Sequence, residues 1–335
     1  MVHKKVKKRT LLWKTISGVK VSGRGDILRE ATEFYKELYN LPEIAEDGTE
    51  REEMHRSTPQ GEPFLPLLRH EVEDTLRNLK VGKASGPDKI ENKTLKEFAG
   101  VLAEPLTLLF NRIITQEAIP KQWKKAEIIL LHKKGDKCQL NNYRPISLSS
   151  NISKVFMKII KNRAYPQLDS AQPVEQAGFR KGFATTDHIH TLNQLIEKTN
   201  AYQLGVNMVF IDFCKAFDTV YHNYLWNALR EQGINEKIIR ILENYYDNTC
   251  AYVNMGGLGP EYRLHRGLKQ GEPLSPSLFN PLLEHIFTKL DWEEKRIKID
   301  GQNLNHSRFA DDIALLSGDG GARGNALRAG SRACH

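Results

Sequence analysis

The amino-acid sequence predicts an α+β protein with more than one lobe. Its 335 residues can bury a substantial core and exceed the usual size of a single lobe. Segments with apolar residues at helical spacing are interspersed with short apolar runs of strand length. These segments follow one another irregularly and without an internal repeat, which favours the α+β class over a regular βαβ alternation.

Composition and charge favour a polyanionic partner. The formal net charge is +8 and the pI is about 9.1, so nucleic acid is the expected partner, with a basic protein that binds none as the alternative. The four cysteines are scattered without a CxxC pair, which argues against a zinc site and a disulfide framework. The basic start has no apolar leader and no run of about 18 apolar residues occurs, so we expect no secretion signal and no membrane span. An intracellular location, nuclear or cytoplasmic, is therefore expected.

Residues 1–66 are expected to form a basic arm, one helix and a linker upstream of the main domain. Basic residues cluster between Lys4 and Arg9, which is typical of a nuclear-import signal or a nucleic-acid contact, with a solvated tail as the alternative. Helical spacing predicts a helix over residues 27–39. The polar stretch 41–66, interrupted by Pro and Gly, predicts the linker.

The rest of the chain is expected to alternate irregularly between helices and strands. The early elements are a helix from Glu71, a turn at 82–87, a helix at 92–116, a strand at 128–132, a turn leading into a helix after Asn141, and a helix from Thr185 with Ile189, Leu192, Leu195 and Ile196 on one face. Residues 206–212 predict a central strand covered on both faces. Later elements are helices at 225–231 and Glu236–Tyr246, a helix opened by Ser275 and Pro276, and a hairpin with Asp311 and Asp312 at its turn.

Three aspartates stand at the ends of apolar runs. Asp212 closes the run VNMVFID, and Asp311 and Asp312 interrupt FADDIALL. Burying a carboxylate in such a run is costly unless a cation pairs with it, and three carboxylates on neighbouring strands would repel one another. Such oxygen ligands select Mg²⁺ or Mn²⁺, and two such ions assist phosphoryl transfer. The alternative is that each aspartate caps a turn.

An ordered set of motifs resembles the reverse transcriptases of non-LTR (LINE-type) retrotransposons. The motifs are GKASGPDKI, HKKGD with NYRPISL, QAGFRKGFATTDHI, FIDFCKAFDTV, GLKQGEPLSPSLFN and FADD, and they cover about residues 81–316. The resemblance implies a right-hand polymerase fold with fingers and palm. It places the fingers, with the N-terminal part of the reverse transcriptase domain, at residues 67–205 and the palm at residues 206–316.

The resemblance also implies an activity and its partners. The expected reaction is RNA-directed DNA synthesis, in which deoxynucleoside triphosphates are added to a DNA primer 3′ end on an RNA template with Mg²⁺ or Mn²⁺. Two alternatives stay open: a catalytically dead nucleic-acid-binding remnant of a mobile element, and an RNA-directed RNA polymerase. No membrane partner is expected, and no oligomeric state follows from the sequence.

In the palm, the resemblance assigns metal binding and catalysis to Asp212, Asp311 and Asp312. Because side chains alternate along a strand, Asp311 and Asp312 need not face the same ion, and Asp311 is expected to be the closer ligand. Phe217 lies where the family places a bulky ring under the sugar, which would exclude a 2′-hydroxyl; a core role is the alternative. Asp218 also matches the motif, with a helix N-cap role as the alternative.

The resemblance assigns the remaining site residues to substrate and strand contacts. Gln270 and Gly271 match the loop beside the incoming base and template, where glycine permits close approach. Fingers contacts to the triphosphate fall on Lys133, Lys134 and Arg144, because a guanidinium suits bidentate phosphate binding and lysine acts as a point charge. Template-backbone contacts fall on Arg180 and Lys181, with a plain surface position as the alternative.

The end of the sequence departs from the family pattern. Residues 317–335 are rich in Gly, Ala and Arg and contain few large apolar residues, so we expect a non-homologous tail and a chain truncated within the palm, with the thumb absent. Pro281 stands inside a predicted helix, where it costs about 3 kcal/mol unless the helix kinks. The activity of a chain that ends in this way does not follow from the sequence.

Overall fold

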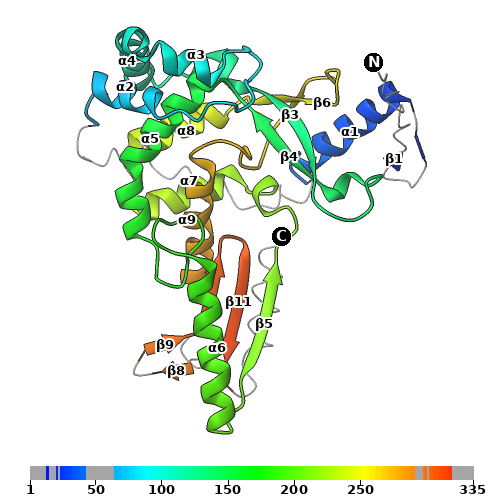
Figure 1. Ribbon diagram of the computed structural model, residues 1–335, viewed down its shortest axis with the longest axis vertical. Helices are drawn as coiled ribbons and strands as arrows, with labels where there is room; N and C mark the ends of the chain where they lie inside the picture. The colour runs from blue at the N-terminus through cyan, green and yellow to red at the C-terminus, as the bar shows by residue number, and fades with distance from the viewer. Residues whose placement is uncertain are drawn as a thin grey trace, which may run out of the picture. The chain divides into compact units, whose positions relative to one another are not determined.

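The computed structural model describes residues 13–14, 20–21, 23–42, 64–290, 297–299 and 302–318 (Figure 1). The described residues form two compact units. The first draws on Met1–Ile160, Asp218–His222 and Glu236–Pro273, and the second on Lys161–Phe217, Asn223–Asn235 and Leu274–His335. Helices and strands are mixed in both units, which confirms the predicted mixture of α and β structure. The predicted basic arm, most of the linker and the tail after residue 318 lie outside the described residues.

In the first unit, a four-stranded sheet has the order β4-β3-β6-β7, and its strands β3 and β4 flank the HKKGD motif and carry NYRPISL. The pairing of β3 with β6 is parallel, and the other two pairings are antiparallel. Helix α1 covers one face of this sheet, because Ile27, Ala31 and Tyr35 are buried in one cluster with Ile128 and Val253. The bounds are α1 Arg24–Leu38, β3 Lys125–His132, β4 Tyr143–Leu148, β6 Cys250–Asn254 and β7 Tyr262–Arg263.

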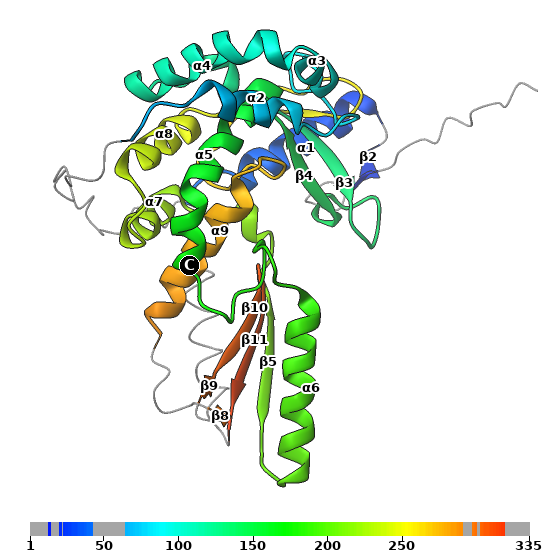
Figure 2. The ribbon, with the colours of Figure 1, turned by 60° about the vertical axis from the view of Figure 1, so that its left-hand side comes forward.

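Further helices belong wholly or partly to this unit. Helices α2, α3 and α4 pack together (Figures 1 and 2). The rings of Phe110, Trp123 and Phe156 meet between α4, a short 3-10 helix and α5. The bounds are α2 Arg69–Arg77, α3 Asn92–Glu97, α4 Ala99–Gln116, the 3-10 helix Lys121–Lys124, α5 Asn151–Ser170, which continues into the second unit, and α8 Glu236–Tyr246.

The second unit is built around a three-stranded antiparallel sheet with the order β10-β11-β5. Ile313 and Leu315 of this sheet are buried with Phe287 of α9. Helix α6 runs alongside the sheet (Figures 1 and 2), where the hydroxyl of Ser307 is hydrogen-bonded to the ring of His188. The bounds are α6 Thr185–Ala201, β5 Asn207–Asp212, α9 Ser275–Thr288, β10 His306–Phe309, β11 Asp312–Ser317, and α7 His222–Glu231, which begins in the first unit.

Three small elements complete the described fold. Strands β1 (Trp13–Lys14) and β2 (Lys20–Val21) pair in the first unit, and β8 (Ile297–Ile299) pairs with β9 (Gln302–Leu304) in the second. The residues that close β5 precede a 3-10 turn at Ala216–Asp218. In the described part of the chain, no helix combines the length and apolar content that crossing a bilayer requires.

Several sequence expectations need correction. Strand β5 lies at an edge of its sheet, not at the centre, and Phe210 is 71% exposed. Residues 143–148, expected to lead from a turn into a helix, form β4, and the helix expected at 92–116 is broken at Phe98. On α6, only Leu195 of the predicted apolar face is buried. Apolar content alone does not distinguish an edge strand from a central one, because both have the same local pattern.

The predicted hairpin is present, and the helix expected to contain Pro281 continues through that residue. The turn between β10 and β11 contains Asp311, as predicted, and Asp312 begins β11. Pro281 lies inside α9, which continues through it, as α4 and α5 continue through Pro105 and Pro166.

Candidate active site

Two of the three predicted catalytic aspartates face each other across the sheet of the second unit. Strand β5 ends at Asp212 and β11 begins at Asp312, and these residues are direct partners in the antiparallel register. Directly opposed residues project from the same face, with Cβ atoms typically about 5 Å apart. Both aspartates are exposed, and Asp311 is half-buried in the adjoining turn. The backbone therefore places all three aspartates at one end of this sheet.

The turn geometry decides which aspartate faces Asp212. Phe309 pairs with Asp312, so the loop consists of Ala310 and Asp311. Such two-residue turns need positive φ at a central residue, and Ala310 has φ of 56°. Asp312 thus lies opposite Asp212 in Cα register, while Asp311 occupies the turn. That Asp311 is the closer metal ligand stays a prediction, because Cα register does not determine where its carboxylate oxygens lie.

The donor chemistry of this end of the sheet fits a hard divalent cation. Carboxylate oxygens are the ligands that Mg²⁺ and Mn²⁺ prefer, and the two opposed aspartates offer them from one face. As placed, however, no three His, Cys, Asp or Glu side chains in the described residues converge closely enough to hold a metal ion. The residues therefore fit a divalent cation in the type of their ligand atoms and in the strand register that sets Asp212 opposite Asp312.

Phe217 is held in an aromatic stack. Its ring lies parallel to that of Phe279 from α9, with centroids 4.6 Å apart and an interplanar angle of 13°. The ring of Phe179 meets it edge-on at 5.8 Å. Both geometries are favourable for aromatic pairs. Phe217 is only half-buried. Its ring is therefore held in place by two aromatic neighbours and still partly exposed to solvent.

In the first unit, Arg144 and the Gln270–Gly271 loop lie on the same face of the β4-β3 ladder. Residues alternate along β4, so Arg144 and Ile146 share a face, and Arg144 is exposed. The amide of Ser147 donates to the carbonyl of Gln270 at 2.7 Å. Gly271 has φ of 110°, and a Cβ there would lie 3.5 Å from Ile146 Cγ2 and 3.0 Å from the Ser147 carbonyl oxygen. This position therefore favours glycine.

Lys133 and Lys134 follow the end of β3. Both side chains are exposed, and the backbone amide of Lys133 donates to the carbonyl of Asn142 at 2.8 Å. The two lysines are therefore placed by a closed loop and keep their ammonium groups in solvent. This arrangement is compatible with an anion contact and equally with a solvated turn.

Asp218 has a role that the sequence interpretation missed. Its side chain is 1% exposed and accepts hydrogen bonds from the Tyr39 hydroxyl at 2.9 Å and from Gln270 Nε2 at 2.8 Å. Burial, together with the Asp218 charge, holds the pKa of Tyr39 well above its usual value. Asp218 therefore orients the predicted Gln270 side chain, and it lies in the 3-10 turn, before the start of α7.

Lys269 and Glu272, which flank the Gln270–Gly271 loop, are buried. The ammonium group of Lys269 lies 3.7 Å from the centroid of the Tyr245 ring and has no hydrogen-bond partner among the described residues. Burial lowers its pKa to about 8. In the same described part of the chain, neither carboxylate oxygen of Glu272 accepts a hydrogen bond. A lysine in GLKQGEP resembles any basic surface residue, so nothing in the linear sequence indicated this burial.

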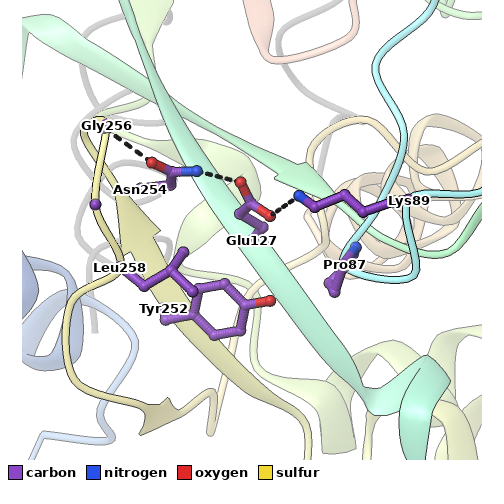
Figure 3. Close-up of a pocket in the computed structure, with 8 residues that line it drawn as sticks. Pro87, Lys89, Glu127, Tyr252, Asn254, Gly256 and Leu258 are labelled. Carbon is purple, nitrogen blue, oxygen red and sulfur yellow. Dashed lines mark hydrogen bonds and ion pairs between the residues drawn. The ribbon is translucent and has the colours of Figure 1, made fainter.

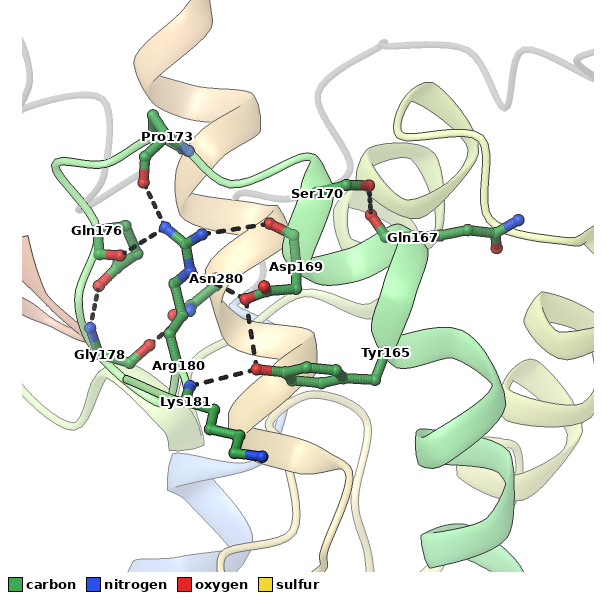
Figure 4. A network of polar contacts seen from close by, with 10 residues as sticks. All are labelled: Tyr165, Gln167, Asp169, Ser170, Pro173, Gln176, Gly178, Arg180, Lys181 and Asn280. Carbon is green, nitrogen blue, oxygen red and sulfur yellow. Dashed lines mark hydrogen bonds and ion pairs between the residues drawn. The ribbon is translucent and has the colours of Figure 1, made fainter. Parts of the chain in front are cut away.

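Arg180 makes internal contacts, which differs from the predicted template contact. Its guanidinium donates to Asp169 Oδ1 at 3.0 Å and to the carbonyls of Pro173 at 2.6 Å and Gln176 at 3.1 Å (Figure 4). Lys181, by contrast, is exposed. A pocket of about 560 Å³ beside them is lined by Lys161, Asn162, Tyr165, Phe179, Arg180 and Lys181. Lys181 is thus the better placed of the two for an outside strand.

The GKASGPDKI motif has an architectural place in the first unit. Lys89 Nζ lies 3.3 Å from Glu127 Oε2, and Asn254 contacts the other oxygen of this buried carboxylate (Figure 3). A Cβ at Gly86 would lie 2.3 Å from the Ser149 carbonyl oxygen. The motif is therefore pressed against the sheet and against the start of α5. A pocket of about 340 Å³ opens beside Glu127 and Tyr252.

Comparisons with known proteins agree with these observations. The family described as "Reverse transcriptase (RNA-dependent DNA polymerase)" matches residues 131–329. The probable RNA-directed DNA polymerase from transposon BS of Drosophila melanogaster is 31% identical over 258 residues, which is 76% of this chain and 28% of that protein. The RNA-directed DNA polymerase from mobile element jockey of Drosophila melanogaster is 27% identical over 261 residues, again 76% of this chain and 28% of the relative.

A further retroelement protein and a solved structure are also similar. The retrovirus-related Pol polyprotein from type-1 retrotransposable element R2 of Popillia japonica is 30% identical over 209 residues, covering 59% of this chain and 28% of that protein. Apo telomerase from Candida tropicalis, truncated from its C-terminal domain, aligns with a TM-score of 0.45 and 14% identity over 74% of this chain and 54% of that one. The chain spans about 28% of the length of these three retroelement relatives. The chain belongs to the reverse transcriptase family, in the group encoded by non-LTR retrotransposons.

Proposed function

We propose that this chain is the polymerase core of an RNA-directed DNA polymerase, with fingers and palm in a right-hand arrangement. The observation that carries the proposal is the direct opposition of Asp212 and Asp312 at the end of the β5–β11 pair, with Asp311 beside them in the turn. Deoxynucleoside triphosphates, a DNA primer and an RNA template are the proposed substrates. The domain boundaries expected from the sequence and an intracellular location, nuclear or cytoplasmic, stay predictions.

In the palm, the aspartates hold divalent cations. When bound, two such ions stabilise the attacking and leaving oxygens of the phosphoryl transfer. Asp212 and Asp312 supply ligand oxygens from one face of the sheet, and Asp311 supplies another from the turn. Hairpin and ladder hold these groups before substrate arrives, so little reorganisation is needed.

In the fingers, exposed cations meet the triphosphate. Arg144 binds phosphate oxygens in a bidentate manner, and Lys133 and Lys134 act as point charges at the end of β3. The exposed side chains of Ile129 and Leu131 share the Arg144 face, because they pair with Ile146 and Arg144 in register. An apolar surface edged by a guanidinium suits a nucleotide, whose base is flat and whose phosphates are charged.

Selection of deoxynucleotides falls to Phe217. Its ring is clamped between Phe279 and Phe179, so it does not yield easily to a 2′-hydroxyl. Gln270, oriented by Asp218, and Gly271 line the loop for the template base. Lys181 contacts a strand phosphate. The stacked Phe217 favours DNA synthesis over RNA synthesis.

Primer extension with matched variants tests the proposal. The protein is given an RNA template, a DNA primer, deoxynucleotides and Mg²⁺, and Asp212→Asn is compared with Asp74→Asn, which alters an exposed aspartate of α2. Synthesis should fall in Asp212→Asn by more than the roughly 100-fold typical of losing an outer partner of a metal ligand. Asp74→Asn should keep the wild-type rate.

The other outcomes distinguish the alternatives. Normal extension by Asp212→Asn contradicts the assignment of the metal site. Binding of the RNA–DNA hybrid without any extension by the wild-type chain identifies a catalytically dead remnant. Preference for ribonucleotides identifies an RNA polymerase.

A further inference from the structure

The segment 175–178 adds a short parallel bridge to the hairpin that carries Asp311 and Asp312. The amide of Ala177 donates to the Arg308 carbonyl at 2.9 Å, and the amide of Arg308 donates to the Glu175 carbonyl at 2.7 Å. Gln176 and Arg308 are bridge partners in this short pairing. Strand β10 is therefore held on both edges, by β11 and by this segment.

The Gln176 side chain reaches past this bridge to the turn itself. Gln176 is fully buried. Its Oε1 accepts hydrogen bonds from the backbone amides of Gly178 at 2.8 Å and Ala310 at 3.0 Å. Its Nε2 donates a hydrogen bond to the Ala310 carbonyl at 3.5 Å. One carboxamide therefore meets both backbone polar groups of Ala310, as a neighbouring strand would. Without it, both groups would be left unpaired in a buried place.

Ala310 needs such support because its backbone is unfavourable. Its φ of 56° lies in the left-handed region, where the Cβ of an L-residue crowds the backbone. This conformation closes the two-residue turn, and the turn decides that Asp312 begins β11 opposite Asp212. Relaxation of Ala310 to negative φ would change the turn and move Asp311.

The supporting segment is itself held from several sides. A Cβ at Gly178 would lie 2.1 Å from the Ala310 nitrogen, so only glycine permits this approach. Asn280 Nδ2 of α9 donates to the Gly178 carbonyl at 2.7 Å, and Arg180 donates to the Gln176 carbonyl at 3.1 Å (Figure 4). Gln176 therefore acts from a rigid base, as a residue that positions a catalytic group should.

We propose that Gln176 is a positioning residue that clamps Ala310 and thereby holds the Asp311–Asp312 turn with its carboxylates set against Asp212. Gln176 does not touch substrate. The catalytic consequence rests on the proposed function, whereas the clamp itself is a property of the folded chain.

Hydrogen exchange of the Ala310 amide tests the clamp without requiring activity. Protein labelled with ¹⁵N-alanine is compared as wild type, Gln176→Leu, Gln176→Glu and Gln194→Leu. Leucine fills space but accepts no hydrogen bond. Glutamate keeps the accepting oxygen, and because the position is fully buried and the second oxygen faces the Ala310 carbonyl, we expect it to be protonated and to donate there. Gln194 lies exposed on α6, so Gln194→Leu makes the same chemical change on the surface.

The expected result is local and depends on the acceptor. Gln176→Leu should speed exchange at Ala310 by about tenfold or more, because a buried amide has lost its acceptor. Exchange at sites of the second unit away from segment 175–178 and the hairpin should change far less, and the melting temperature should fall by several degrees because buried hydrogen bonds are lost. Gln176→Glu and Gln194→Leu should stay within about threefold of wild type.

Three results overturn the clamp: unchanged exchange in Gln176→Leu, acceleration that is equal throughout the second unit, or exchange in Gln176→Glu as fast as in Gln176→Leu. If Gln176→Leu does not fold, Gln176→Glu decides alone, and fast exchange at Ala310 in that variant also overturns the clamp.

Kinetics separate the positioning role from the proposed function. In primer extension, Gln176→Leu should lower kcat by about tenfold or more and leave KM for the deoxynucleotide unchanged, because substrate contacts are intact. A normal kcat in Gln176→Leu, beside an inactive Asp212→Asn, removes the positioning role and leaves the function standing. An exchange effect without synthesis by any variant rejects the function and leaves the clamp.

Discussion

Replacement of Gly178 by alanine should disrupt the contact between segment 175–178 and the hairpin that carries Asp311 and Asp312. The added Cβ would lie 2.1 Å from the Ala310 nitrogen and 2.7 Å from its Cα. Carbon contacts are ordinarily about 3.5–4 Å. Both clashing atoms belong to backbone, so no side-chain rotation relieves the overlap, and the two segments must separate by roughly 1.5 Å.

The cost follows from the hydrogen bonds that this separation breaks. They are the bond from Ala177 to Arg308, the bond from Arg308 to Glu175, and the bond from Ala310 to Gln176 Oε1. Each contributes about 1 kcal/mol, so Gly178→Ala should lower the free energy of unfolding by about 3 kcal/mol. A domain is stabilised by only about 5–15 kcal/mol in total.

Urea unfolding followed by circular dichroism measures this cost against two controls. Gly257→Ala adds a methyl group that meets no described residue within 4 Å apart from its chain neighbours, and it should change stability by less than about 0.5 kcal/mol. Gly182→Ala adds no clash but strains a residue with φ of 86°, and it should cost about 1–2 kcal/mol. The slope of free energy against urea should stay constant in all three variants, which makes the midpoints comparable.

A Gly178→Ala protein as stable as Gly257→Ala would refute the close approach of Gly178 to Ala310. Gly178 itself has no positive φ, so a loss no larger than that of Gly182→Ala would show that the hydrogen bonds between the two segments survive the added methyl group.

Three further predictions test other parts of the molecule. Phe217→Val should raise ribonucleotide incorporation relative to deoxynucleotides, and Phe279→Leu should do so to a smaller extent. An unchanged ratio of kcat/KM for the two nucleotides, together with a loss of about 3–5 kcal/mol in the free energy of unfolding of Phe217→Val, would instead mark Phe217 as a core residue. The pKa of Lys269 is lowered to about 8, so between pH 8 and 10 the unfolded chain binds more protons than the folded chain, and the free energy of unfolding should rise with pH by roughly 2 kcal/mol. Urea midpoints at these pH values should show this rise in wild type and not in Lys269→Met. Burial, with the charge of Arg308, lowers the pKa of His306 to about 3, so as the pH falls the unfolded chain binds a proton before the folded chain does. Lowering the pH from 7 to 5 should therefore reduce the free energy of unfolding of the wild type by roughly 2 kcal/mol. His306→Phe should lack this loss when unfolding is measured at both pH values.

The sequence by itself determined the features that depend on local pattern. Helix α8 begins and ends where its spacing of apolar residues predicts, and α1 differs from its prediction by a few residues. The hairpin turn at Asp311 followed from an apolar run that carboxylates interrupt, but the sequence left open whether that run pairs with the run that ends in Asp212. The motif order was enough to indicate the family. Each of these features depends on residues that lie near one another along the chain, so it can be predicted without knowing which other segment they contact.

Only the tertiary structure decided which partners these elements meet. It placed β5 at a sheet edge and paired β4 with β3 where a turn and helix were expected. It set Asp312, and not Asp311, opposite Asp212, because strand register depends on how a turn closes. It gave Arg180 internal acceptors and buried Lys269 over an aromatic ring. Gln176 and Ala310 are 134 residues apart in sequence, and a contact at that separation leaves no periodic trace in the chain because it exists only once the two segments are packed together.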